Sequence, residues 1–225
     1  MEIVPGIHKV DGVNGNCYVV ERENLVVIDT GMPGSGRKIL SYIENTMQRQ
    51  PDEIGTIFLT HFHMDHTGGL ATLKKASSKA KVAIHEADAG YLSGKVALPQ
   101  YPGIKGMLLH IGEKIMGPKP IIPDILLKDG DRVDGLLCLS LPGHTPGSIG
   151  LLIEGSKVFF LGGILIFDGK SVVPGPAFFT MDHARERESI MRIAGLHFET
   201  LLAGHGVPLH PGAAAKVGEL ADTLQ

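Results

Sequence analysis

The sequence predicts an α/β fold built from two halves. Short apolar runs rich in β-branched residues alternate with stretches of helical periodicity, in a similar order in both halves of the chain. Loops that carry histidine follow three of the apolar runs. We therefore expect each half to form one β-sheet covered on its outer face by helices, with chemically active side chains at the strand ends.

The first half is predicted to begin with short strands and to continue through two helices. The spacing of Ile39 and Ile43 predicts a helix over residues 37–48, and residues 67–77 have the composition of a second helix. The Gly-rich segment 29–36 is expected to be a loop. Apolar runs predict strands at residues 7–10, 16–21, 24–29, 56–60 and 81–85.

Residues 94–124 interrupt this alternation because they are rich in Gly and Pro. We expect a helix of about two turns inside a longer insertion. Insertions of this kind often cover a functional site, and a packed surface excursion is the alternative that the sequence leaves open. The apolar residues of the insertion include Met107, Leu108, Leu109, Ile111, Ile115 and Met116.

The second half repeats the order of strands and helices. Helices are expected over residues 183–194 and near residues 212–224. No linker and no short-period repeat divides the chain, so residues 1–225 are predicted to form a single domain. The strands of this half are predicted at residues 125–128, 136–141, 148–154, 157–161 and 200–203.

The composition is that of an ordinary globular protein. The chain has 225 residues, of which 43% are hydrophobic and 20% are charged, and this allows one large domain or two small ones. The net charge is -3, so we expect neither nucleic acid nor an anionic membrane as a partner. A small-molecule substrate is expected instead, and a homodimer is compatible with the sequence.

Cysteine use and the N-terminus favour a reducing compartment. The only two cysteines, Cys17 and Cys138, lie far apart and without metal or disulfide spacing. The chain starts with strand-like alternation rather than the pattern of a secretion signal, and no apolar run is long enough to cross a bilayer. A cytoplasmic location is therefore expected.

A dense histidine cluster follows the buried run at residues 56–60. The stretch THFHMDH contains His61, His63, Asp65 and His66. Residues two apart in extended chain point the same way, so the first two histidines can face one metal ion. The other two residues lie past a bend and can turn to a second ion. Imidazole and carboxylate are the ligands that zinc and iron use in proteins.

Two further histidines occupy matching positions. His144 lies in the stretch LPGHTPGS and His205 in the stretch LLAGHG, and each follows a predicted strand. A histidine between Gly and Pro residues in a loop has no evident packing role. The remaining histidines lack such a setting and are interpreted as surface or core residues: His8, His85, His110, His183, His197 and His210.

These stretches, together with IDTG at residues 28–31, resemble the metallo-β-lactamase superfamily over nearly the full length of the chain. The resemblance implies a four-layer αββα sandwich of two mixed β-sheets flanked by helices. It implies zinc as the metal, as one or two ions, with iron or manganese as alternatives. The candidate ligands that it transfers to this chain are His61, His63 and His144 for a first metal, and Asp65, His66 and His205 for a second. Asp29 would lie beside the ligands without being one.

One position departs from the family pattern. Members usually have a Gly-Asp pair after the strand that follows the PGHTPGS stretch, and the Asp bridges both metals; here the pair is Gly162 and Gly163. Removing this carboxylate increases the repulsion between two close cations, so we expect weaker metal binding, chiefly at the second position. Asp168 would substitute only through a rearranged loop, and Asp182 is interpreted as a helix N-cap.

The resemblance implies hydrolysis by a hydroxide held between the metals, with Asp65 orienting this nucleophile as the candidate catalytic residue. A small ester, thioester, lactone or lactam is the expected substrate, with activity altered or reduced by Gly163. The insertion at residues 94–124 is the candidate wall of the substrate pocket. Two alternatives remain: a mononuclear iron sulfur dioxygenase, and a catalytically silent, metal-poor binding protein.

Overall fold

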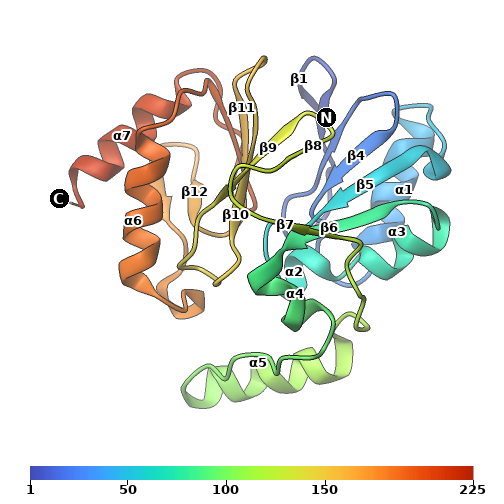
Figure 1. Ribbon diagram of the computed structural model, residues 1–225, viewed down its shortest axis with the longest axis horizontal. Helices are drawn as coiled ribbons and strands as arrows, with labels where there is room; N and C mark the ends of the chain where they lie inside the picture. The colour runs from blue at the N-terminus through green and yellow to red at the C-terminus, as the bar shows by residue number, and fades with distance from the viewer. Residues whose placement is uncertain (225) are drawn as a thin grey trace. The chain divides into compact units, whose positions relative to one another are not determined.

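A computed structural model describes residues 1–224 and divides the chain into two compact units (Figure 1). The first unit contains residues 1–84 and 89–126, and the second contains residues 85–88 and the chain from Leu127 onward. No helix among the described residues is both long and apolar enough to span a membrane.

The first unit contains a mixed sheet of seven strands in chain order. The strands are β1 (Glu2–Val4), β2 (Ile7–Lys9), β3 (Tyr18–Val20), β4 (Leu25–Ile28), β5 (Ile54–Phe58), β6 (Lys81–His85) and β7 (Ile125–Leu127). Pairing is antiparallel from β1 to β4 and parallel from β4 to β6. The parallel strands end at one edge of the sheet, and the histidine cluster follows β5 at that edge. All five strands predicted for the first half are present.

Two helices cover one face of this sheet, α1 (Ser35–Asn45) and α3 (Leu70–Ala76) (Figure 1). Ile39 and Leu70 are fully buried against Val27 of the sheet, in one continuous apolar core. Burying a side chain of this size stabilises a fold by roughly 1.5–3 kcal/mol. The apolar spacing that predicted both helices therefore matches the face that is buried.

The insertion contains a longer helix than the sequence predicted. The short helix α4 (Glu86–Leu92) is followed by α5 (Gly103–Met116), which has 14 residues and so about four turns rather than two. Gly106 lies inside α5. A Cβ atom there would approach the carbonyl oxygen of Tyr101 to 1.9 Å, so this glycine allows close packing instead of ending the helix.

Helix α5 exposes much of its apolar surface. The exposed side chains recur at helical spacing along the helix: Ile104, Met107, Leu108, Ile111 and Ile115. Leu109 and Met116, which the sequence places in the same apolar run, lie outside the described side chains. The apolar pattern of this segment therefore does not mark a core-facing helix.

The second unit contains a sheet of five strands in the order β14-β11-β10-β9-β8. Its strands are β8 (Arg132–Val133), β9 (Leu136–Ser140), β10 (Ile149–Ile153), β11 (Val158–Leu161) and β14 (Thr200–Ala203). Pairing is antiparallel except between β11 and β14, which are parallel neighbours. A separate hairpin of β12 (Leu165–Phe167) and β13 (Val172–Pro174) was not predicted from the sequence.

The helices α6 (His183–Ala194) and α7 (Ala213–Asp222) cover this second sheet. Phe159 of β11 packs in one apolar core with Ile190 of α6 and Val217 of α7. The bounds of α6 match the prediction, and α7 lies within the predicted segment. Each unit thus has its own buried apolar core, and its candidate residues lie in loops that follow strands of its sheet.

Candidate metal centre

The first unit brings His61 and His63 together in the loop after β5. Their side chains are buried, and His61 Nε2 lies 3.0 Å from His63 Nδ1. The two ring centroids are 4.7 Å apart. Two imidazole nitrogens therefore face one point, as the extended HxH spacing predicted.

Asp65 and His66 lie just past this loop, in the single-turn helix α2 (Met64–Thr67). Nε2 of His66 is 3.6 Å from a carboxylate oxygen of Asp65. The ring of His66 lies 4.1 Å from that of His61, centroid to centroid. The four residues of the HxHxDH stretch thus form one cluster within the first unit.

Asp29 holds this cluster from the end of β4. Its carboxylate is buried and accepts a hydrogen bond from Nδ1–H of His66 at 2.7 Å. It also accepts hydrogen bonds from the backbone N–H and the hydroxyl of Thr60, both at 2.8 Å. Asp29 has a φ of 57°, a left-handed conformation that aspartate tolerates. Asp29 thus lies beside the candidate ligands, as predicted.

These hydrogen bonds fix which ring nitrogens are available. Because the Thr60 hydroxyl donates to Asp29, its oxygen must accept from Nδ1–H of His61, at 3.0 Å. His66 likewise donates through Nδ1. Both rings are therefore held with Nε2 as the nitrogen that can bind a metal.

The charge around His66 favours its protonated form when no metal is bound. Burial lowers the pKa of His66, but the carboxylates of Asp65 and Asp29 outweigh this effect and raise the pKa to about 9. A divalent cation bound at this position would replace that proton, because both satisfy the same two carboxylates.

Tyr101 contacts the cluster from the insertion. Its hydroxyl lies 2.9 Å from Nε2 of His63, whereas the other ring nitrogen, Nδ1, faces His61. This contact fixes the orientation of the His63 ring. Neither Tyr101 nor Thr60 was predicted from the sequence to contact the cluster. For Thr60, its position immediately before His61 was a usable signal; for Tyr101 the sequence offers none.

The remaining candidate residues belong to the second unit. His144 follows β9, Gly163 follows β11 and His205 follows β14. Because β11 and β14 are parallel neighbours with Leu161 opposite Ala203, Gly163 and His205 follow adjacent strand ends. The geometry is that of side chains presented from the carboxyl edge of a sheet, as the sequence predicted.

The loop that carries His144 is anchored by a residue that the sequence analysis missed. Asp88 is fully buried, accepts a hydrogen bond from the Thr145 hydroxyl at 2.7 Å and accepts another from the backbone N–H of Gly147 at 2.7 Å. The buried carboxyl of Glu186 lies 4.0 Å from Nδ1 of His144. Burial raises the pKa of Glu186 above its usual range.

Gly163 lies directly against the ring of His144. A Cβ atom at residue 163 would approach Nε2 of His144 to 2.3 Å. The φ of Gly163 is outside the left-handed region, so the backbone itself would accept an L-amino acid. The imidazole therefore fills the space in which the side chain of an aspartate would begin.

The acids that follow Gly163 have other roles. Asp168 accepts hydrogen bonds from the backbone N–H groups of Lys170 and Ser171, both at 2.8 Å, in the turn between β12 and β13. These bonds hold its pKa below the usual range. Asp182 caps α6 by accepting a hydrogen bond from the N–H of Arg185, as predicted.

The donors of the first unit fit a divalent transition metal. His61 and His63 present two imidazole nitrogens to one point, and Asp65 and His66 present a carboxylate and an imidazole side by side. A buried carboxylate, Asp29, orients two of the three rings from behind. Backing of ligand histidines by a carboxylate is typical of protein metal sites.

Comparison with known proteins agrees with this chemistry. A family model for the metallo-beta-lactamase superfamily matches residues 10–205. The probable metallo-hydrolase YflN of Bacillus subtilis is 30% identical, in an alignment that covers 92% of this chain and 86% of YflN. Human acyl-coenzyme A thioesterase MBLAC2 is 26% identical, with coverage of 86% of this chain and 74% of the thioesterase.

Solved structures confirm the predicted fold class. The crystal structure of TTHA1623 in a di-iron-bound form superposes with a TM-score of 0.72 at 27% identity. The superposition covers 93% of this chain and 96% of TTHA1623.

Proposed function

This chain belongs to the metallo-beta-lactamase superfamily, and on that premise we propose that it is a metal-dependent hydrolase of a small ester, thioester, lactone or lactam. The observation that carries the proposal is the cluster of His61, His63, Asp65 and His66 held by Asp29. The cluster contains both donor types that hydrolytic zinc and iron centres use.

The proposed ligand set is the one that the family resemblance transfers to this sequence. A bound divalent cation would supply Lewis acidity and would lower the pKa of water to near neutrality. The first metal is assigned to His61, His63 and His144, and the second to Asp65, His66 and His205. Zinc is the proposed metal, and iron or manganese are the alternatives.

The residues of the chain have distinct roles in this proposal. Asp65 is partly exposed and is the candidate group to orient the attacking water and to accept its proton. Asp29 is a positioning residue, because it fixes the rings of His61 and His66 and lies behind both. Tyr101 orients His63 in the same way from the insertion.

A thioester is the substrate class that we favour. The relative MBLAC2 is named as an acyl-coenzyme A thioesterase, and a thioester carbonyl needs no activation beyond water attack and stabilisation of the oxyanion. The net charge of -3 gives no reason to expect a nucleic-acid substrate. We further propose a cytoplasmic location, and a homodimer is compatible with the sequence.

Gly163 is proposed to weaken binding of the second metal. Metal analysis of protein purified without chelator tests this, with one tightly held ion per chain expected. The variant Gly163→Asp should raise metal content and hydrolysis of a panel of a thioester, a lactone and the β-lactam nitrocefin. His144 must first turn away, because its ring occupies the space of the new Cβ atom.

Gly155→Asp is the matched control. A Cβ atom at Gly155 meets nothing within 4 Å, so this variant adds the same charge far from any contact. Two tightly held metals in the unmodified chain would contradict the proposed weakening. If neither the unmodified chain nor Gly163→Asp hydrolyses any member of the panel, the silent binding protein becomes the better interpretation.

A mononuclear iron sulfur dioxygenase is the second candidate. It needs a single iron ion, and the first metal position retains three candidate histidine ligands, because Gly163 is expected to weaken metal binding chiefly at the second position. Iron content together with oxygen consumption on a persulfide substrate would support this activity. Zinc content with hydrolysis under anaerobic conditions would exclude it.

A further inference from the structure

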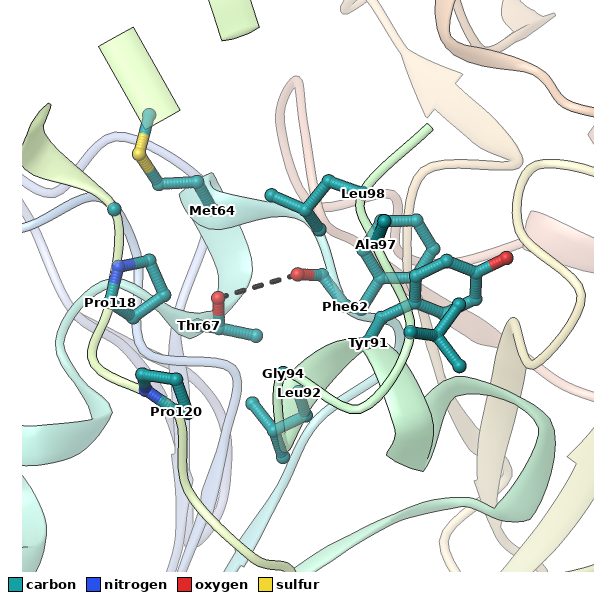
Figure 2. A pocket seen from close by; sticks show the side chains of 12 residues that line it. Phe62, Met64, Thr67, Tyr91, Leu92, Gly94, Ala97, Leu98, Pro118 and Pro120 are labelled. Atoms are coloured by element: carbon teal, nitrogen blue, oxygen red, sulfur yellow. Dashed lines mark hydrogen bonds between the residues drawn. The ribbon is translucent and has the colours of Figure 1, made fainter. Parts of the chain in front are cut away.

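The first unit contains a cavity of about 260 Å³ that borders the histidine loop (Figure 2). The buried side chains of Phe62, Thr67 and Leu92 contribute to its lining. Residues of the insertion complete the wall, among them Leu98 and Pro118. The cavity is therefore built jointly by the candidate metal loop, by α4 and by the insertion.

The lining of the cavity is mostly apolar. None of the described residues that line it carries a charged side chain. The hydroxyl of Thr67 donates to the backbone oxygen of Phe62 at 3.4 Å, as Figure 2 shows. It also lies within hydrogen-bond distance of the backbone oxygen of His63, at 3.1 Å. The ring of Tyr91 stacks on Phe62 at 4.2 Å, centroid to centroid. A charged ligand group would find no charged partner among these residues, so the cavity favours a hydrocarbon group.

The cavity and the candidate ligands share one segment of chain. Phe62 and Met64 line the cavity, and they alternate along the sequence with His61, His63 and Asp65. The ring of Phe62 meets that of His63 edge-on, with centroids 4.9 Å apart. A group that fills the cavity therefore lies one side chain away from a candidate metal ligand.

We propose that this cavity is the acyl subsite of the enzyme, and that it binds the uncharged hydrocarbon chain of an acyl thioester or ester. This inference rests on the proposed function, since it takes the substrate carbonyl to be hydrolysed at the neighbouring histidine loop. The volume is adequate, because an apolar cavity of about 150 Å³ already holds a benzene molecule. The cavity thus selects acyl groups longer than acetyl.

Binding to chelator-treated, full-length protein tests the cavity without relying on hydrolysis. The neutral fluorescent probe N-phenyl-1-naphthylamine should bind and be displaced by octanamide. Ala97→Phe places a ring in the wall of the cavity, and Leu98→Asp places a charge there. Each variant should weaken probe binding roughly tenfold, as expected from the loss of a few buried methylene contacts.

Two controls separate this cavity from other apolar surface. Ala71→Phe adds the same ring at an exposed position of α3 and should leave binding unchanged. The double variant Ile104→Gln, Ile115→Gln removes exposed apolar side chains of α5 and should also leave it unchanged. Probe binding that survives both cavity variants, or that is lost with the α5 variant, overturns the proposal.

Kinetics with a series of acyl thioesters complete the test. For the unmodified protein, kcat/KM should rise roughly two- to fourfold per added methylene between acetyl and octanoyl. Ala97→Phe should lower the octanoyl-to-acetyl ratio at least tenfold. Hydrolysis with a flat chain-length profile overturns the acyl subsite but leaves the proposed function intact. Absence of hydrolysis at every chain length, with normal probe binding, contradicts the proposed thioester hydrolysis instead.

Discussion

Asp29 shows how one buried carboxylate can prepare several metal ligands. It accepts hydrogen bonds from His66 and from Thr60, and Thr60 in turn accepts one from His61. Two rings therefore take their tautomer from one side chain that is not itself a candidate ligand. The residue directly follows the buried strand β4, and its backbone N–H donates to the carbonyl oxygen of Phe58 at 2.8 Å.

We expect Asp29→Asn to weaken zinc affinity about 10- to 100-fold, the usual cost of removing a carboxylate behind a ligand histidine. Asparagine cannot accept all three hydrogen bonds, and its amide would donate toward groups that are themselves donors. Competition with a chromophoric chelator measures the affinity. Asp11→Asn, at an exposed carboxylate, is the control, and equal affinities for the two variants would show that Asp29 does not position the ligands.

Helices α1 and α5 illustrate why apolar periodicity alone does not assign a role to a helix. Ile39 and Ile43 of α1 are fully buried, whereas Ile104 and Ile115 of α5 are 76% and 77% exposed. Both helices carry isoleucines at helical spacing. Only the contact with a sheet distinguishes them, and this contact depends on the rest of the fold.

Truncation of these four isoleucines should therefore destabilise the fold at α1 and not at α5. Ile39→Ala and Ile43→Ala should each lower the free energy of unfolding by about 2–5 kcal/mol, because each leaves a cavity in the core. Ile104→Ala and Ile115→Ala should change it by no more than about 0.5 kcal/mol. Urea unfolding midpoints measure the difference, and a large loss at Ile104 or Ile115 would mean that α5 is buried in solution.

The sequence predicted most strands and helices because their apolar runs are long or strictly spaced. It missed the hairpin of β12 and β13, because each strand has only three residues and carries too short a pattern. It predicted too short a helix for α5 because the insertion is rich in Gly and Pro, whereas Gly106 lies inside the helix, where the close approach of Tyr101 requires a glycine. These errors arise where tertiary contacts override local pattern.

For the candidate site too, some residues could be predicted from the sequence and others could not. The histidines could be found from the sequence because their spacing is unusual and they follow predicted strands. Asp88 could not, because it binds Thr145 and Gly147 across 57 and 59 residues of chain. Residues 85–88 belong to the second unit although residues of the first unit precede and follow them in sequence. A single sequence carries no sign of such a pairing.

Metal binding should stabilise the folded chain as a whole, because the unfolded chain does not present its ligands together. At a free zinc concentration of 100 times the dissociation constant, the gain is about 2.7 kcal/mol. For a chain of this length that corresponds to a rise in Tm of about 5–11 °C, which thermal unfolding in chelator and in zinc would measure. His61→Ala should remove most of the shift, and magnesium should not reproduce it, since imidazole binds magnesium poorly. Equal Tm values in chelator and in zinc would contradict a metal centre in this protein.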